Sequence, residues 1–401
     1  MTHLTAQPWM TAPETRAVMA ALNIGGGVAR FVGGCVRNAL IGAPVDDIDI
    51  ATALTPGEVL VRAQEAGLRA VETGIDHGTV TLIADGRPFE VTTLRVDVTT
   101  DGRRAAVAFT DDWARDAARR DFTINALYAD ETGTIFDFVG GLGDIAERRV
   151  RFIGDPDARI REDYLRSLRF FRFFAWYGAA PPDADALAAI VRNRAGLKGL
   201  SAERVQKEFL RLLDAPDPMA ALDAMNEAGV TTALVPEFTR PERLACLIAL
   251  DASRDAILRL AAGIATGDAS QLAARLKLAS AAATRLAGLV AGNIQLTDGQ
   301  SVRRALYAHD GAAVRDFAYL ARARHEIDGA QMKAALAAAE TWTRPRFPLT
   351  GNDVTARGVA PGPRVGALLG ALERDWIDEN FSASRETLLA RLDARLKAQG
   401  N

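Results

Sequence analysis

Two aspartates spaced two positions apart are the residues of this chain best placed to do chemistry. Asp47 and Asp49 follow a Gly33-Gly34 pair and Arg37 in the stretch RFVGGCVRNALIGAPVDDIDIAT. In an extended strand, residues two apart point to the same side, so both carboxylates would project from one face. Their repulsion is best relieved by divalent cations such as Mg²⁺ bound between them. The glycines would let a phosphate approach the backbone N–H groups, and Arg37 would supply a fork of donors to the same anion.

The elements that must position these residues are short. Phe31 and Val32 predict a strand that breaks at Gly33, and a helical piece carrying Arg37 follows. A second strand would present both aspartates while Ile48 and Ile50 enter the core. The acidic pair follows the glycines too closely for a full βαβ unit, which argues against a dinucleotide-binding fingerprint.

Further strands and helices surround this stretch. The sequence predicts a helix over 13–22 and another that begins after a Thr55 cap. Segments 79–83 and 89–94, separated by a short turn sequence, predict a hairpin. Glu90 on its second strand is either a third carboxylate for the metal site or an exposed strand glutamate.

The string RRDFTINALY, residues 119–128, follows a polar segment at 101–104 that we interpret as a loop beside the site. Its apolar positions predict a helix, with Arg120 and Asp121 at the start, where they could contact a triphosphate and ribose hydroxyls. The alternative without a functional role is a capped helix start with surface charge.

A single long helix is predicted over 159–177, because Asp163, Arg166, Arg169 and Arg172 recur every three residues along one face. Between residues 148 and 172 the chain carries eight arginines and four acids, a net charge of +4 within a chain of net charge −3. Spacing alone favours a solvated face with ion pairs. A basic patch for a nucleic acid or a nucleotide is the functional alternative.

Length and composition set further limits. With 401 residues, two to four subdomains are expected. No 18-residue apolar run predicts a membrane span, and no basic region followed by an apolar segment predicts a secretory signal, so we expect a cytoplasmic protein. Cys35 and Cys246 are too few for a disulfide framework and are expected to be buried free thiols. The four histidines are scattered, which argues against a metal-dependent phosphohydrolase domain.

Several motifs together resemble one family. G-G-x-x-R, nine residues and D-x-D resemble the signature of the nucleotidyltransferase superfamily typified by DNA polymerase beta. The flanking residues and RRDFTINA resemble bacterial class II tRNA nucleotidyltransferases, the CCA-adding enzymes, and poly(A) polymerases. E-D-x-x-R at 162–166 resembles the nucleotide-selecting motif of that family. Residues 201–208 resemble its next helical motif, in which Glu203 and Arg204 are expected to brace the neck and not to touch substrate. One departure is Asn38, where the family usually has Asp.

The resemblance implies a role for each matching residue. Asp47, Asp49 and Glu90 would be catalytic, and the two aspartates would hold Mg²⁺. The implied nucleotide-binding residues are Gly33, Gly34, Arg37, Arg120, Asp121, Glu162, Asp163, Arg166, Arg169 and Arg172.

The implied fold is α+β, with a small mixed-sheet nucleotidyltransferase head followed by an all-helical neck, body and tail. We place the catalytic head at 1–150, the neck with its nucleotide-selecting helix at 151–215, the body at 216–341 and an RNA-binding tail at 342–401.

The implied activity is addition of CCA to the 3′ end of tRNA from CTP and ATP without a nucleic-acid template. The 3′-hydroxyl would attack the α-phosphate by a two-metal mechanism and release pyrophosphate. tRNA is the expected partner, with no membrane and no stable protein partner. A poly(A) polymerase and an enzyme that adds only CC or only A are alternatives, and a non-catalytic RNA-binding protein is the alternative from another class.

Overall fold

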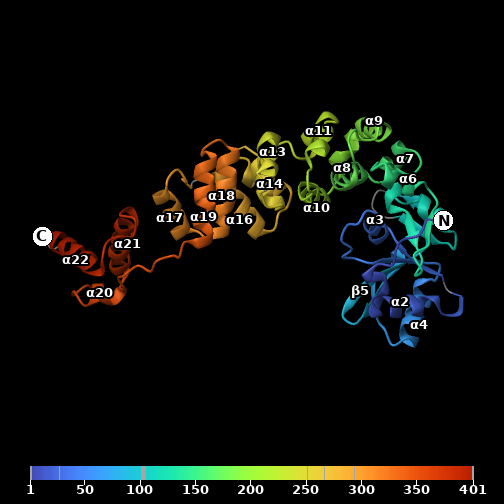
Figure 1. Ribbon diagram of the computed structural model, residues 1–401, viewed down its shortest axis with the longest axis horizontal. Coiled ribbons are helices and arrows are strands. Elements are labelled where there is room, and N and C mark those ends of the chain that lie inside the picture. Colours follow the sequence, from blue (N-terminus) through green and yellow to red (C-terminus); the bar gives the residue numbers. More distant parts are fainter. Residues whose placement is uncertain are drawn as a thin grey trace. The chain divides into compact units, whose positions relative to one another are not determined.

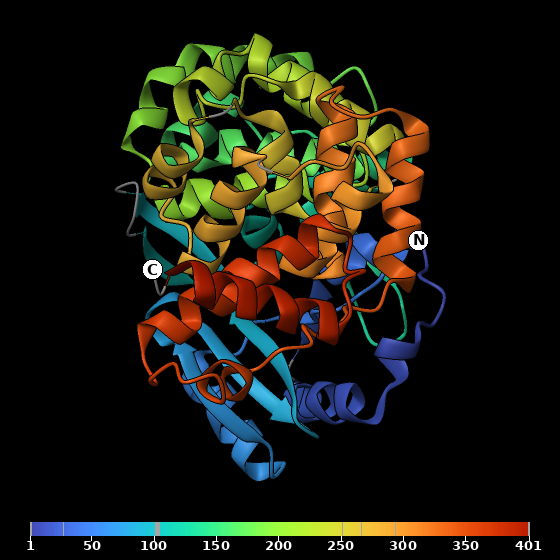
Figure 2. The ribbon, with the colours of Figure 1, turned by 90° about the vertical axis from the view of Figure 1, so that its left-hand side faces the viewer.

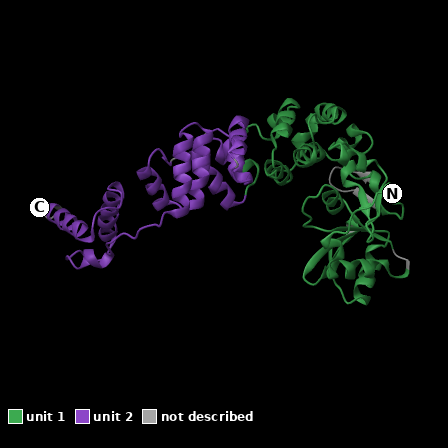
Figure 3. Ribbon diagram, in the orientation of Figure 1, with its two compact units in different colours: residues 1–238, 274–278 green, residues 239–273, 279–401 purple. Residues whose placement is uncertain are grey.

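The protein is an α+β chain whose mixed sheet is confined to its first part, as the sequence predicts. The computed structural model describes residues 2–26, 28–100, 105–250, 252–265, 267–292 and 294–399, so the loop predicted at 101–104 lies outside the described residues. Two compact units are distinguished in Figure 3: Met1–Phe238 with Ala274–Leu278, and Thr239–Ala273 with Ala279–Asn401. Our finer division into head, neck, body and tail stays a prediction.

The head contains a seven-stranded sheet in the order β3-β4-β5-β2-β1-β8-β9 (Figures 1 and 2). Every neighbouring pair is antiparallel except β2 and β5, which run parallel. The strands are β1 Ala29–Val32, β2 Asp49–Thr52, β3 Arg69–Gly74, β4 Thr79–Ala84, β5 Arg87–Thr93, β8 Leu127–Ala129 and β9 Ile135–Asp137. A separate two-stranded sheet consists of β6 Arg95–Thr100 and β7 Ala105–Phe109.

Local sequence rules account for several elements of the head. Helix α2, Pro13–Asn23, and helix α4, Pro56–Glu65, are the two predicted helices, and both pack on β4. Thr55 and Glu58 form a reciprocal capping box at the start of α4, which satisfies two free N–H groups of the first turn. The predicted hairpin is β4–β5, and its two turn residues both have positive φ, as the tight turn requires.

The helix predicted over RRDFTINALY is wrong. After α5, Trp113–Ala118, the chain forms only a short 3₁₀ turn, η3 Thr123–Asn125, and then enters strand β8. Every residue from 121 to 129 is buried, so the apolar positions do not mark one face of a helix. Backbone pairing with other segments determines the conformation of residues 121–129: Phe122 bridges Phe152, and β8 pairs with both β1 and β9.

The single helix predicted over 159–177 is also wrong, because it is two helices. Helix α7, Pro156–Glu162, ends at Asp163, and helix α8, Leu165–Tyr177, begins two residues later. Asp163 adopts an extended backbone with φ −156°, and its Oδ1 accepts a hydrogen bond from the Leu165 N–H at 3.1 Å. Asp163 therefore ends the first helix, and its side chain accepts a hydrogen bond from the N–H of the first residue of the second, whose N-cap residue is Tyr164.

The rest of the first unit is helical and packs on α8, which contacts α10 and α11. Aromatic rings join this helical part to the head: Phe122 lies 4.8 Å from Phe152, and Phe152 stacks on Phe170 of α8 at 5.9 Å between ring centroids. The remaining elements of this part are α6 Gly141–Ala146, α9 Ala184–Asn193, η4 Arg194–Gly199, α10 Ala202–Leu213, α11 Met219–Glu227 and α12 Val230–Leu234.

From residue 239 onward the described chain contains helices only. They form two hydrophobic clusters, one around Val314 and Ala318 and one around Leu372 and Trp376. Within the described residues, no helix is both long enough and apolar enough to cross a membrane. The helices are α13 Pro241–Ala249, α14 Ala256–Gly263, α15 Ala269–Arg275, α16 Ser280–Ala291, α17 Gly299–Ala308, α18 Gly311–Ala323, α19 Gly329–Thr341, α20 Gly351–Thr355, α21 Pro363–Asp378 and α22 Arg385–Gln399.

The two cysteines differ from each other. Cys35 is a buried free thiol, as predicted, but Cys246 is only half-buried, so the prediction of two buried thiols is wrong for Cys246.

Candidate active site

The parallel pairing of β2 with β5 brings together the three carboxylates singled out in the sequence. Asp49 is the first residue of β2 and lies in register with Glu90 of β5. Asp47 lies just before the strand, where it is exposed, and Ile48 and Ile50 are buried. The alternation predicted from the sequence is therefore present, although the regular strand begins two residues later than expected. We call Asp47, Asp49 and Glu90 the carboxylate edge.

The carboxylate edge carries more negative charge than its surroundings neutralise. Burial, followed by the neighbouring carboxylates of Glu90 and Asp47, raises the pKa of Asp49 to about 6 against the opposing charges of Arg120 and Arg37. Desolvation and like charge both disfavour an ionised carboxylate. The site is thus electrostatically prepared for an added cation.

Oxygen ligands of this kind fit Mg²⁺. Among the described residues, no group of three or more His, Cys, Asp or Glu side chains is arranged to hold a metal ion. Mg²⁺ does not need such a group, because it is usually held by one or two carboxylates together with substrate phosphates and water. Asp47 and Asp49 are the pair that could hold it.

The two glycines lie beside two arginines. Gly33 has φ 72°, a conformation that favours glycine, and a Cβ there would lie 3.7 Å from Nη1 of Arg120. A Cβ at Gly34 would lie 3.7 Å from Nη2 of Arg37. The absence of side chains keeps the backbone before helix α3, Gly34–Leu40, open next to both guanidinium groups.

Arg120 is held by a buried aspartate that the sequence did not single out. Asp116 is completely buried, and its Oδ2 accepts hydrogen bonds from Nη2 of Arg120 at 3.1 Å and from the hydroxyl of Tyr128 at 2.7 Å. Burial opposes the charge of Arg120, but Tyr128 and Asp116 outweigh it and raise its pKa above the usual value. Arg120 therefore stays a cation whose Nη1 faces Gly33, as the predicted phosphate contact requires.

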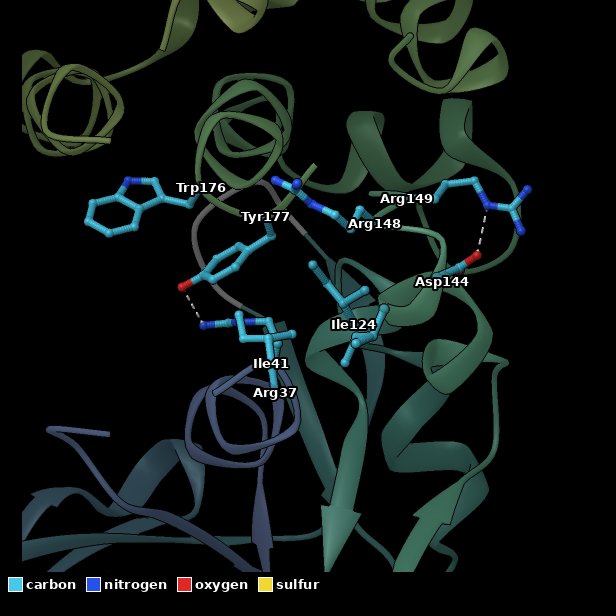
Figure 4. A pocket seen from close by; sticks show the side chains of 9 residues that line it. Arg37, Ile41, Ile124, Asp144, Arg148, Arg149, Trp176 and Tyr177 are labelled. Atoms are coloured by element: carbon cyan, nitrogen blue, oxygen red, sulfur yellow. Dashed lines mark hydrogen bonds and ion pairs between the residues drawn. The ribbon is translucent and has the colours of Figure 1, made fainter. Parts of the chain in front are cut away.

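Arg37 is less open than the sequence pattern suggested. It is 7% exposed, and its guanidinium donates to Asn125 Oδ1, to Asn38 Oδ1 at 3.1 Å and to the hydroxyl of Tyr177 at 2.9 Å (Figure 4). Burial lowers its pKa. Its predicted phosphate contact stays a prediction, and its present contacts join the head to the C-terminal end of α8.

The departure at Asn38 has a structural consequence. While its Oδ1 accepts from Arg37, its Nδ2 donates to the carbonyl of Pro44 at 2.8 Å. A carboxylate has no donor for that carbonyl, so an aspartate would not make the second contact. Asn38 therefore fixes Arg37 and the segment leading to Asp47 at the same time.

Three further predicted residues meet in one ion network. Nε of Arg169 donates to Oδ2 of Asp121 at 2.8 Å, and Arg169 and Arg172 both pair with Glu208 of α10. Burial opposes ionisation of Asp121, but Arg169 and hydrogen bonds from Asn125 and Phe122 outweigh it and lower the pKa of Asp121 to about 2. We call Asp121, Arg169, Arg172 and Glu208 the head–neck network.

The predicted base-reading residues lie at the break between α7 and α8. Oδ2 of Asp163 accepts from Nη2 of Arg204 at 2.6 Å, and Arg166 donates through Nη1 to Glu162 and to the carbonyl of Arg159. A carboxylate offers about four lone-pair sites, so Asp163 keeps capacity to accept another hydrogen bond. Arg204 thus links α10 to the break between α7 and α8, and the bracing role expected for it stays a prediction.

Sequence reasoning missed Asp116, Asn125, Tyr177 and Glu208. Asn125 lies in the motif RRDFTINA, so the resemblance offered a signal for it. Asp116 lies four residues before Arg120, so a local charge pattern could have indicated it, whereas Tyr177 and Glu208 meet the site only through tertiary packing.

Comparison with known proteins agrees with this geometry. The chain matches two family models, "Poly A polymerase head domain" over residues 29–151 and "Probable RNA and SrmB- binding site of polymerase A" over 182–240. It is 32% identical over 380 residues to the mouse (Mus musculus) mitochondrial CCA tRNA nucleotidyltransferase 1, covering 90% of this chain and 85% of that one. It is 39% identical over 223 residues to the CCA-adding enzyme of Geobacillus thermodenitrificans, covering 55% of this chain and 54% of the relative.

Solved structures show the same fold along the chain. The Bacillus stearothermophilus CCA-adding enzyme, in complex with CTP, matches with a TM-score of 0.75 and 26% identity over 98% of this chain and 99% of that one. The Thermotoga maritima CCA-adding enzyme, in complex with tRNA, shares the fold with a TM-score of 0.68 and 18% identity over 99% of this chain and all of that one (100%). With its carboxylate edge, its glycine pair and a relative matched over most of both lengths, the chain belongs to the CCA-adding enzyme and poly(A) polymerase family of nucleotidyltransferases.

Proposed function

We propose that the protein adds CCA to the 3′ end of tRNA, using CTP and ATP and no nucleic-acid template. The observation that carries the proposal is the carboxylate edge beside Gly33 and Arg120: acidic residues in need of a cation lie next to groups suited to phosphate. The names of the relatives, and the CTP and tRNA bound in two similar structures, support this choice of substrates.

In the proposed reaction the 3′-hydroxyl of the RNA attacks the α-phosphate of the incoming nucleotide, and pyrophosphate leaves. Mg²⁺ held by Asp47 and Asp49 would supply activation of the hydroxyl and stabilisation of the charge on the leaving group. Glu90 adds a third negative charge beside Asp49 and orients the edge through its strand register. The open backbone at Gly33 and Gly34 and the cation of Arg120 hold the triphosphate, so catalysis depends on positioning and charge.

Base choice is assigned to the break between α7 and α8. Cytosine and adenine both present an amino donor beside a ring-nitrogen acceptor, whereas uracil and guanine present a carbonyl beside a protonated nitrogen. Asp163 would accept from the amino group while Arg204 and the Leu165 N–H hold its carboxylate in place. Arg166 would donate to the ring nitrogen through guanidinium nitrogens other than Nη1, which is occupied by Glu162.

Glu162, Asp121, Arg169 and Arg172 have a different proposed role. Glu162 fixes Arg166, and the other three hold the head against the neck, so all four would shape the nucleotide site through the residues that they position. Arg37 would bind phosphate once nucleotide binding releases its contacts with Asn125 and Tyr177.

The test uses tRNA transcripts that end before, within and after CCA, with each nucleoside triphosphate supplied separately and then together. The expected result is completion of CCA followed by a stop, with poor extension of an unstructured oligonucleotide. Long adenosine tails with CTP ignored would replace the proposal with poly(A) polymerisation. Addition that stops after CC, or that requires a preformed CC end, would assign a partial enzyme. tRNA binding without any incorporation would favour the non-catalytic alternative.

We also propose that the protein acts in the cytoplasm. Relatives from mouse and human carry the word mitochondrial in their names, so fractionation of the source cell is the test.

A further inference from the structure

A pocket of about 340 Å³, lined by Arg37 among other residues, lies where α3, α6 and the end of α8 meet (Figure 4). Figure 4 shows Trp176, Tyr177 and Arg148 along one side of this pocket and Ile41 and Ile124 on the other. Its volume is near the lower end of the range of roughly 300–1,000 Å³ in which small-molecule sites fall. It offers room for one nucleotide rather than several.

The charge of the pocket is positive. Three arginines and one aspartate line it, and the aspartate, Asp144, is buried and already neutralised. Its Oδ1 accepts from Nε of Arg149 at 2.8 Å, and its Oδ2 accepts from Nε of Arg151 at 3.1 Å. Arg148 is exposed and donates to the carbonyl of Gly178 at 3.1 Å, and it forms no ion pair with any residue that the structure describes. Arg148 is therefore a cation available for an anion.

The aromatic wall is fixed in place and yet open. Trp176 is 37% exposed, although its Nε1 is anchored by donation to the carbonyl of Arg211 at 2.7 Å. Tyr177 is held by Arg37 through its hydroxyl, and the guanidinium also lies 4.1 Å from the centre of the tyrosine ring. The centroids of the Trp176 and Tyr177 rings lie 6.5 Å apart. Tyr177 is half-buried, and its ring also stacks on Phe173 at 5.8 Å between centroids, so Trp176 offers the exposed ring of this wall. An anchored, exposed ring beside an unpaired arginine is what a base and its phosphate require.

Arg37 connects this pocket to the candidate active site. Its Nη2 donates to Tyr177 on the pocket side and lies near the Cβ position of Gly34 on the other. An occupant of the pocket would thus be separated from the triphosphate-binding backbone by a single side chain.

We propose that this pocket is a second nucleotide-binding site, in which the base packs against Trp176 and Tyr177 and a phosphate pairs with Arg148. The occupant is a ribonucleotide unit, either a free nucleoside triphosphate or an unpaired nucleotide of the RNA substrate. The second source rests on the proposed function.

The first experiment counts nucleotides. Equilibrium dialysis of the full chain with labelled CTP is expected to show two molecules bound for the unchanged protein and one for Arg148→Ala combined with Trp176→Ala. Arg69→Ala, an exposed arginine on β3, is the matched control and should still bind two. Trp176→Phe keeps an aromatic ring and should retain the second site, and thermal unfolding of every variant shows whether each one folds.

The second experiment distinguishes the two sources. If the occupant is part of the RNA, a tRNA transcript lacking CCA should displace the second CTP, and the double variant should raise KM for tRNA by roughly tenfold with kcat and KM for CTP unchanged. If the occupant is a free nucleotide, tRNA leaves the second CTP bound and KM for tRNA does not change.

One bound CTP in the unchanged protein, together with an unaltered KM for tRNA in a folded double variant, would overturn the proposal. That outcome leaves CCA addition by the unchanged protein intact. Absence of all nucleotide transfer by the unchanged protein would instead refute the proposed function, while the dialysis result would still decide whether the second site exists.

Discussion

The carboxylate edge and the head–neck network shift the pKa of an aspartate in opposite directions. At the edge, Asp49 lies beside Glu90 and near Asp47, and burial followed by these two carboxylates raises its pKa to about 6. In the network, burial also opposes ionisation of Asp121, yet Arg169 and neighbouring hydrogen bonds lower its pKa to about 2. Asp49 is half-buried and Asp121 is buried, so desolvation raises the pKa of both, and their charged partners decide the sign of the net shift.

The difference distinguishes a site suited to binding a cation from a network that holds two parts of the protein together. The network neutralises its own charges, so it can fix the head against the neck without any added group. The edge leaves charge uncompensated, which costs stability in the absence of a cation and favours binding of one. The following four changes break or sharpen that comparison.

The largest effect is expected from removing charge at the edge. Asp47→Asn or Asp49→Asn should lower incorporation by more than about a hundredfold, since even outer-shell partners of a metal are worth 10–100-fold. tRNA affinity should be nearly unchanged, because phosphate contacts on basic surfaces dominate binding to RNA. Single-turnover incorporation and filter binding measure the two quantities. Asp46→Asn, an exposed neighbour of the pair, is the control and should keep its activity. Normal turnover in both edge variants would refute the assignment.

The next effect is on base choice. Asp163→Ala and Arg166→Ala should each reduce the preference for CTP and ATP over UTP and GTP by about 5- to 150-fold, the range that corresponds to 1–3 kcal/mol per base contact. Competition between labelled nucleotides on one tRNA transcript measures the preference. Arg161→Ala removes an exposed arginine from the same segment and should not change it. An unaltered preference in the first two variants would show that the base is read elsewhere.

A smaller effect, on stability, is expected in the network. Asp121→Asn should lower the free energy of unfolding by about 2–3 kcal/mol at pH 7, the value of a pKa lowered from 3.8 to about 2. Because the folded pKa is depressed, this contribution is present above pH 4 and is lost as the pH falls towards 2. Urea unfolding at several pH values should therefore show the two proteins converging in acid. If the difference in free energy of unfolding between the two proteins did not decrease at low pH, the asparagine would act through altered packing and not through the lost charge.

The smallest effect is expected for an exposed pair in the same unit. Lys277 contacts Glu203 at 2.5 Å, but their side chains are 61% and 56% exposed. Lys277→Ala should change the free energy of unfolding by at most about 0.5 kcal/mol, because water and salt screen such pairs. Denaturant unfolding in low and high salt checks this. A loss as large as that of Asp121→Asn would show that burial does not separate the two pairs.

The sequence by itself determined the features that depend on neighbours along the chain. The glycine pair and the Asp-Ile-Asp alternation located the site, and Thr55 located the start of α4. The tight turn between β4 and β5 was equally readable, since its residues tolerate positive φ. Caps, turns and alternation are local rules, so no distant segment is needed to apply them.

Only the tertiary structure decided which distant groups meet. Glu90 became a neighbour of Asp49 because β2 and β5 pair in parallel, and Arg169 reaches Asp121 across 48 positions of the chain. The helix expected over RRDFTINALY gave way to a strand because β1 and β9 pair with it on both sides. Except for the β8–β9 pairing, these contacts join residues tens of positions apart. Their free energy comes from burial and hydrogen bonds between segments, which no local pattern encodes.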